Sequence, residues 1–137
     1  MNEQEAKRRF AAAQVARLTT VGPGDRPHVV PVVFAVEGDR IHSGVDEKPK
    51  RDSRLKRLRN ISENSSVSML VDHYEDDWEN VWWVRADGDA RVVEDDGELE
   101  HARELLRAKY PQYEELGLGI GGAIVIDVTR WSFWSYR

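Results

Sequence analysis

VARLTTVGPGDRPHVVPVVFAVEGDRIHSGV, residues 15–45, carries the clearest strand and turn signals in the chain. Two turn sequences, Gly22-Pro23-Gly24-Asp25 and Glu37-Gly38-Asp39, separate three runs that are rich in β-branched residues. Glycine, proline and aspartate favour tight turns, whereas β-branched side chains favour strands. The stretch therefore predicts three consecutive antiparallel strands, over residues 15–21, 28–36 and 40–45.

Three helices are predicted outside this stretch. Asn2 followed by Glu5 resembles a capping box and predicts a helix over residues 3–14. Ser53 can cap a second helix, on which apolar residues recur every three positions along one face. That apolar stripe consists of Leu55, Leu58 and Ile61. The third helix is predicted to begin near residue 99 and to end near Tyr110-Pro111.

Four further strands complete the prediction. They are expected at residues 67–71, 81–93, 123–128 and 131–136, with the last two joined at Thr129-Arg130. Asp87-Gly88-Asp89 marks a bend or bulge inside the long strand. Many short strands with helices between some of them fit a closed or nearly closed barrel better than a parallel sheet. We predict an α+β fold, mainly antiparallel β, with peripheral helices.

Composition narrows the class of protein. A chain of 137 residues fits a single domain over residues 1–137, and the absence of cysteine excludes disulfides and thiolate metal sites. A net charge of −5 argues against the broad basic surface that nucleic-acid binding uses. The first residues are acidic, and no long apolar run follows them. We expect a cytoplasmic protein that binds neither nucleic acid nor membrane.

Several local patterns carry no predicted site. Gly117, Gly119 and Gly122 spell a dinucleotide-binding motif, but a helix precedes them and a strand follows, which reverses the required context. The acidic loop over residues 72–77 matches no metal-binding spacing and is interpreted as solvated. His28, His42 and His101 are scattered singly along the chain. We therefore predict no metal site.

The basic segment, residues 48–60, is the strongest electrostatic feature of an acidic chain. It carries seven cationic side chains against one carboxylate, Asp52. Arg54 and Arg57 share one helical face, and Lys50 precedes the helix start, where backbone N–H groups favour an anion. The pattern fits a phosphate site and a solvated helix surface equally well. Nucleic acid is a weaker alternative because no aromatic residues interleave the cations.

Aromatic residues fall on both faces of two predicted strands. Trp82 is followed directly by Trp83, and residues 131–136 carry four aromatic side chains. Successive side chains of a strand point to opposite faces, so one aromatic set lines the barrel while the other meets a partner. Homodimerisation explains this pattern, and burial under the chain's own helices is the alternative.

The order of these elements resembles the flavin and deazaflavin oxidoreductases related to pyridoxamine-5'-phosphate oxidase. The resemblance is greatest to actinobacterial members regarded as coenzyme F420-dependent enzymes. It spans nearly the whole chain and is carried by residues 16–22, 26–32, 45–50, 57–61, 67–72 and 77–88.

The resemblance implies a six-stranded FMN-binding split barrel that forms a homodimer, with two cofactor sites at the subunit interface. It implies that Lys50, Arg54 and Arg57 face the cofactor phosphate and that Lys48 and Asn60 support them. The remaining implied contacts are Gly44 and Val45 beside the ribityl chain, Val30 and Pro31 near the ring, and Trp78 at the pocket border.

The function implied by this resemblance is hydride transfer between coenzyme F420, a deazaflavin, and a small-molecule substrate. No side chain is identified as the catalytic acid. An FMN-dependent enzyme of the same fold is the first alternative, and a flavin- or heme-binding carrier without turnover is the second.

Overall fold

The computed structural model describes residues 1–46, 55–95 and 97–137 of the chain. Its described strands form one antiparallel sheet in the order β2-β1-β5-β6-β7-β4-β3. The strands are β1 (Ala16–Gly22), β2 (Arg26–Val32), β3 (Ala35–Glu37), β4 (Arg40–Asp46), β5 (Ser66–His73), β6 (Trp82–Val93) and β7 (Ile120–Ser135). The predicted α+β, mainly antiparallel architecture is confirmed.

A two-residue connection rolls this sheet into a barrel. β2 and β3 are the two edge strands of the sheet, yet only Val33 and Phe34 separate them in sequence. So short a link forces the two edges together, because two residues span only about 7 Å. Phe34 is fully buried at this corner, with its ring centroid 5.2 Å from that of Phe10.

The corner at Phe34 interrupts the strand predicted over residues 28–36, which divides into β2 and β3. Two neighbouring side chains replace the lost strand pairing. The Tyr110 hydroxyl accepts from the Phe34 N–H at 3.1 Å and lies 3.0 Å from the carbonyl oxygens of Phe34 and Gln14. Lys109 Nζ donates to the carbonyl of Phe34 at 2.9 Å and to those of Ala11 and Ala13 at 3.0 and 2.7 Å. We call these contacts the Phe34 anchor.

The two C-terminal strands predicted at residues 123–128 and 131–136 are one strand, β7, and the prediction of a break at Thr129-Arg130 is wrong. Asp87 pairs with Arg130 and Gly88 with Val128, so Thr129 is the extra residue of a β-bulge. Its hydroxyl donates to the Asp87 carbonyl at 3.2 Å. The predicted irregularity at Asp87-Gly88 is confirmed. Gly88 is required there, because a Cβ would lie 2.2 Å from the backbone carbonyl oxygen of Asp127.

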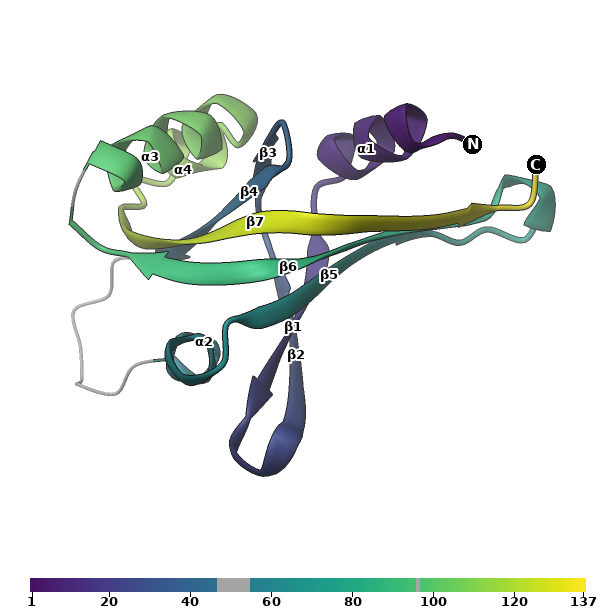
Figure 1. Cartoon of the computed structure of the whole chain (residues 1–137). Helices are drawn as coiled ribbons and strands as arrows, with labels where there is room; N and C mark the ends of the chain where they lie inside the picture. Colours follow the sequence, from purple (N-terminus) through teal and green to yellow (C-terminus); the bar gives the residue numbers. More distant parts are fainter. Residues whose placement is uncertain (47–54, 96) are drawn as a thin grey trace.

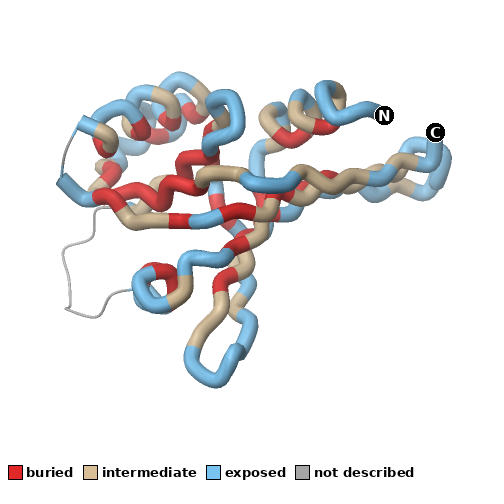
Figure 2. Tube along the Cα trace, in the orientation of Figure 1, coloured by how far each residue is buried: buried red, intermediate tan, exposed pale blue. Residues whose placement is uncertain are grey.

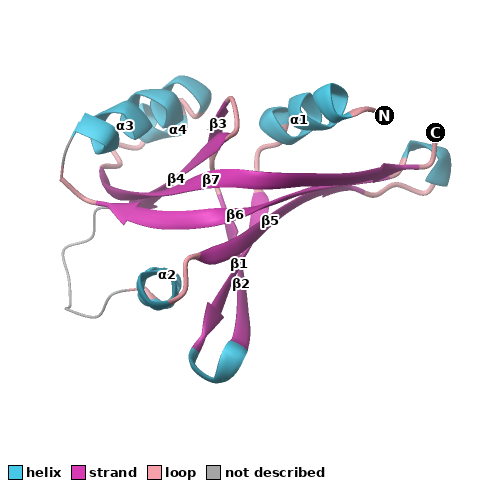
Figure 3. Cartoon of the chain, viewed as in Figure 1, coloured by secondary structure: helices cyan, strands magenta, loops and turns pink. Residues whose placement is uncertain are grey.

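Helices cover both sides of the sheet (Figures 1 and 3). They are α1 (Glu3–Ala12), α2 (Lys56–Glu63), α3 (Gly97–Lys109) and α4 (Gln112–Glu115), with short 3-10 turns η1 (Pro23–Asp25) and η2 (Trp78–Asn80). The predicted cap of α1 is confirmed, since Asn2 Oδ1 accepts from Glu5 N at 2.8 Å. No described helix is long and apolar enough to cross a membrane.

Two apolar cores result. The first fills the barrel and includes Phe10 of α1 and Leu58 of α2. The second lies between α3, α4 and the outer face of β4 and β7, and includes Leu106 and Val125. Buried positions accordingly concentrate along β4 and β7 in Figure 2, whereas the tip of the β1–β2 hairpin is exposed.

Replacing Lys109 with Met tests the Phe34 anchor. Methionine keeps the apolar stem against Phe34 but removes the ammonium from three carbonyl groups. The Phe34 carbonyl keeps the Tyr110 hydroxyl at 3.0 Å, whereas those of Ala11 and Ala13 lose the ammonium, so the free energy of unfolding should fall by about 2–4 kcal/mol. Burial lowers the pKa of Lys109 to about 8, so the measurement belongs at pH 7, where the ammonium is the main form. Urea unfolding measures the loss.

Lys56→Met is the matched control. Lys56 is exposed, and the same substitution there should change stability by less than about 0.5 kcal/mol. Equal stability of Lys109→Met and the wild type would contradict the structural role of the anchor.

Candidate functional site

The end of β4 and the start of α2 form the candidate site. Two hollows, of about 280 and 430 Å³, share Asp46 as a lining residue. The smaller hollow is also lined by Val45, Leu58, Val92, Glu94, Gly121 and Gly122. The larger hollow is also lined by Gln14, Val33, Tyr110, Gln112, Tyr113 and Leu118. The smaller hollow contains Val45, an expected cofactor contact, whereas the larger one contains Tyr110 and Tyr113, which are not expected contacts.

Arg57 is the most informative side chain of the site. It lies in the first turn of α2 and is half-buried, and its Nε is buried without a hydrogen-bond partner among the described residues. Burial lowers the pKa of Arg57, while the nearby Asp46 carboxylate opposes that effect. A buried guanidinium nitrogen without an acceptor is costly, so the site favours an incoming anion.

The N-terminus of α2 adds to this preference. Leu55 occupies the N-cap position and has no side-chain oxygen to accept from the first-turn N–H groups. Such N–H groups and the helix dipole attract anions. Leu55 is exposed, whereas Leu58 and Ile61 are buried, so only part of the predicted apolar stripe packs inward.

Asn60 holds α2 in place. Its side chain is buried and donates to Thr20 Oγ1 of β1 at 2.9 Å. This contact fits the supporting role that the resemblance implies, because it fixes the helix that carries Arg57.

Gly44 is required by packing. A Cβ at this position would lie 3.1 Å from both Leu106 Cδ1 and the Tyr113 hydroxyl. The space beside Gly44 is therefore filled from α3 and α4, and its neighbour Val45 lines the smaller hollow.

Val30 and Pro31 lie on β2, which ends next to the larger hollow. Val30 is partly buried against the barrel core, and Pro31 is exposed. Val33, just beyond β2, lines that hollow, so β2 leads to the site.

Trp78 is not brought to this group within one chain. It lies in η2, next to the first residues of β6, whereas Val92 at the other end of β6 lines the smaller hollow. The length of β6 separates the two ends by roughly 35 Å. Trp78 is 65% exposed, and its indole N–H donates to the Tyr74 hydroxyl at 3.3 Å.

Five residues named for the basic segment and its helix lie outside the described residues. They are Lys48, Lys50, Asp52, Ser53 and Arg54. Of the predicted phosphate contacts, the structure therefore describes Arg57 alone.

Sequence reasoning missed the tyrosines of the larger hollow. Tyr110 and Tyr113 come from the end of α3 and from α4, and no local motif distinguishes them. Burial raises the pKa of Tyr113, and the Asp46 carboxylate raises it further, so its hydroxyl stays protonated at neutral pH. Tyr113 thus offers a protonated hydroxyl beside the site.

The strand order and flanking helices define a split-barrel fold. Residues 3–135 match the pyridoxamine 5'-phosphate oxidase family, and the chain belongs to that family. No curated protein matches the chain.

Solved structures share the fold at low sequence identity. A conserved hypothetical protein from Mycobacterium tuberculosis aligns with a TM-score of 0.77 and 21% identity, over 100% of this chain and 86% of that one. The FAD-binding protein from Mycobacterium smegmatis aligns with a TM-score of 0.69 and 17% identity, over 100% of this chain and 97% of that one. HutZ, a heme storage protein from Vibrio cholerae, aligns with a TM-score of 0.72 and 17% identity, over 97% of this chain and 93% of that one.

Proposed function

We propose that this protein is an oxidoreductase that uses coenzyme F420 as a hydride carrier on a small-molecule substrate. The proposal rests on Arg57 Nε at the start of α2, which is buried without a hydrogen-bond partner among the described residues, and on the N-cap residue Leu55, which provides no side-chain cap. Membership of the pyridoxamine 5'-phosphate oxidase family and the likeness to an FAD-binding protein support a phosphate-bearing cofactor of the flavin type.

Within this proposal, the basic segment binds the cofactor phosphate. Arg57 supplies a charge-assisted contact, with Lys50 and Arg54 beside it and Lys48 in support. Asn60 keeps α2 against β1 through its bond to Thr20. When bound, a deazaflavin supplies a two-electron hydride carrier, and the protein positions the reactants.

The rest of the proposed site comes from the sheet. Gly44 and Val45 run beside the ribityl chain, and Val30 and Pro31 approach the ring. Trp78, in η2 before the start of β6, is too far from this pocket to border it within its own chain.

FMN is the alternative cofactor, because the phosphate site would be equally basic and because a similar fold belongs to an FAD-binding protein. Coenzyme F420 is preferred from the resemblance at residues 45–50 and 57–61. The likeness to a heme storage protein makes a heme carrier the third outcome. The absorbance spectrum of protein purified from an F420-producing host separates deazaflavin, flavin and heme.

Titration with both cofactors tests the proposal. Coenzyme F420 should quench tryptophan fluorescence at lower concentration than FMN does. Arg57→Ala should weaken F420 binding by about 1.5–3 kcal/mol, because a phosphate loses a charged partner that water replaces only partly. Folding should barely change, since in the cofactor-free protein Arg57 Nε satisfies no described group.

Lys56→Ala is the matched control, since it removes one positive charge from the neighbouring, exposed position. It should cost little. Equal losses at Lys56 and Arg57 that fade with added salt would show a diffuse positive surface instead of a specific contact. Tighter binding of FMN would move the assignment to the alternative.

The proposed dimer is supported by an aromatic outer face on the long strands. Trp82 and Phe133 pack against the barrel core, whereas Trp83 and Trp134 pair directly on the opposite face. Trp134 is 45% exposed, and Leu70 of β5 is also exposed nearby, opposite Arg85. An apolar face of this kind is typical of a partner interface.

Light scattering at micromolar concentration should give twice the mass of one chain. Trp134→Glu should shift the mass toward the monomer, because it places a charge in the proposed interface. A monomer mass for the wild type across that range would remove the shared cofactor site.

A further inference from the structure

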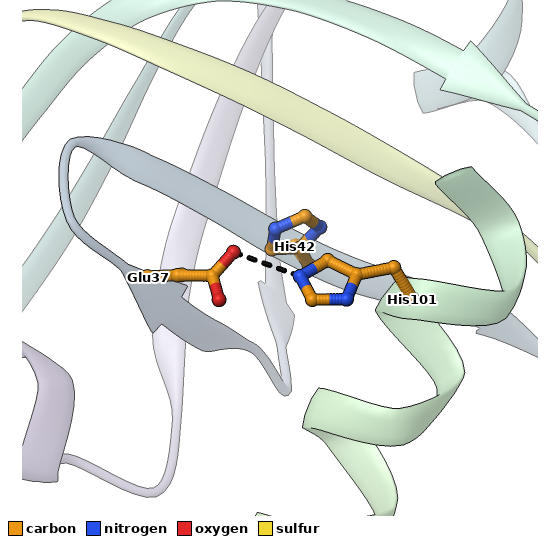
Figure 4. Close-up of side chains that lie close together, drawn as sticks. All are labelled: Glu37, His42 and His101. Atoms are coloured by element: carbon orange, nitrogen blue, oxygen red, sulfur yellow. Dashed lines mark hydrogen bonds and ion pairs between the residues drawn. The ribbon is translucent and has the colours of Figure 1, made fainter. Parts of the chain in front are cut away.

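Three side chains that are far apart in sequence converge on one face of the sheet. Glu37 of β3, His42 of β4 and His101 of α3 offer potential ligand atoms that all lie within 4.8 Å of one another (Figure 4). His101 Nε2 and Glu37 Oε1 are 2.8 Å apart. The fold thus brings together His42 and His101, two of the histidines that are far apart in the sequence.

His42 is what sets this cluster apart from an ordinary surface ion pair. Its side chain is buried, with 1% of its surface exposed, and neither ring nitrogen has a hydrogen-bond partner among the described residues. Buried polar groups are almost always paired, and an orphan costs free energy. The His42 ring lies next to that of His101, with their centroids 5.8 Å apart.

We propose that Glu37, His42 and His101 bind one divalent transition-metal ion, with Zn²⁺ as the representative ion. Two imidazoles and one carboxylate are a ligand set that zinc accepts, and three protein ligands leave a fourth position for water. A bound ion would give the buried His42 ring a partner, which it does not have among the described residues.

The geometry closes with small side-chain movements. In a tetrahedral site with bonds of 2.0–2.1 Å, the ligand atoms are about 3.3 Å apart. His42 is buried, whereas the side chains of Glu37 and His101 are 55% and 45% exposed. The two exposed ligands can therefore move onto an ion that His42 binds first.

The surrounding charges accommodate a cation. Arg40 and Arg91 are positive groups near the cluster, and they share the carboxylates of Asp127 and Glu98. Arg40 Nε lies 2.8 Å from Asp127 Oδ1, and Arg91 Nη1 lies 2.6 Å from Asp127 Oδ2. Glu104 Oε1 lies 4.0 Å from His101 Nδ1, where a carboxylate can orient a metal-bound imidazole.

The site would join α3 to the β3–β4 hairpin. The C-terminal end of the same helix leads into the Phe34 anchor, so the ion and the anchor would hold α3 at two points. Metal binding should therefore stabilise the fold as well as fill the site.

Calorimetric titration of Zn²⁺ into the untagged, chelator-treated full chain tests the proposal. We expect one Zn²⁺ per chain and a raised melting temperature. His101→Ala should weaken binding by at least about 10-fold and abolish the thermal shift. Because His101 is exposed, this variant should fold normally, which circular dichroism checks.

His73→Ala is the matched control. His73 Nε2 lies 2.6 Å from Glu75 Oε2, which makes the same kind of exposed pair without a buried third ligand. Zinc binding should be unchanged in this variant. Absence of wild-type binding, or an equal loss of binding in both variants, would overturn the proposed site.

Discussion

The Phe34 anchor is the interaction on which the rest of the structure depends. The sheet closes because two residues connect its opposite edges, and Lys109 and Tyr110 satisfy the backbone of Phe34 where the strand pairing stops. The same closure creates the site, since Val33 from this corner and Asp46 from the end of β4 line one hollow. Fold and candidate site thus share one physical cause, the need to pair a buried backbone at a sharp corner.

The antiparallel fold class and most of the local elements could be predicted from the sequence, whereas the continuity of β7 across its bulge could not. The Asn2 cap and the irregularity at Asp87-Gly88 depend on neighbouring residues and are confirmed. The division of β7 was wrong because Thr129 shifts the alternation of side chains by one residue. Ile126 and Val128 pack on the barrel core before it, and Trp131 and Phe133 after it. Read without the bulge, that shift resembles the end of a strand.

The candidate site shows the same division. The charge pattern picked out Arg57, but only the fold shows its buried Nε. The resemblance implies roles for Asn60 and Gly44, and the structure adds their contacts. Asn60 bonds α2 to β1, and Gly44 leaves room for Tyr113 and Leu106. The tyrosines of the larger hollow and the pairing of His42 with His101 depend on how α3 packs, which no local spacing reveals.

We propose that the start of α2 is a phosphate site for a flavin-type cofactor. A crystal structure of the protein grown with coenzyme F420 is the decisive test. We expect a cofactor phosphate oxygen within hydrogen-bonding distance of the Arg57 guanidinium, with the ring toward Val30 and Pro31. A cofactor bound elsewhere, with Arg57 Nε still unpartnered, would contradict it.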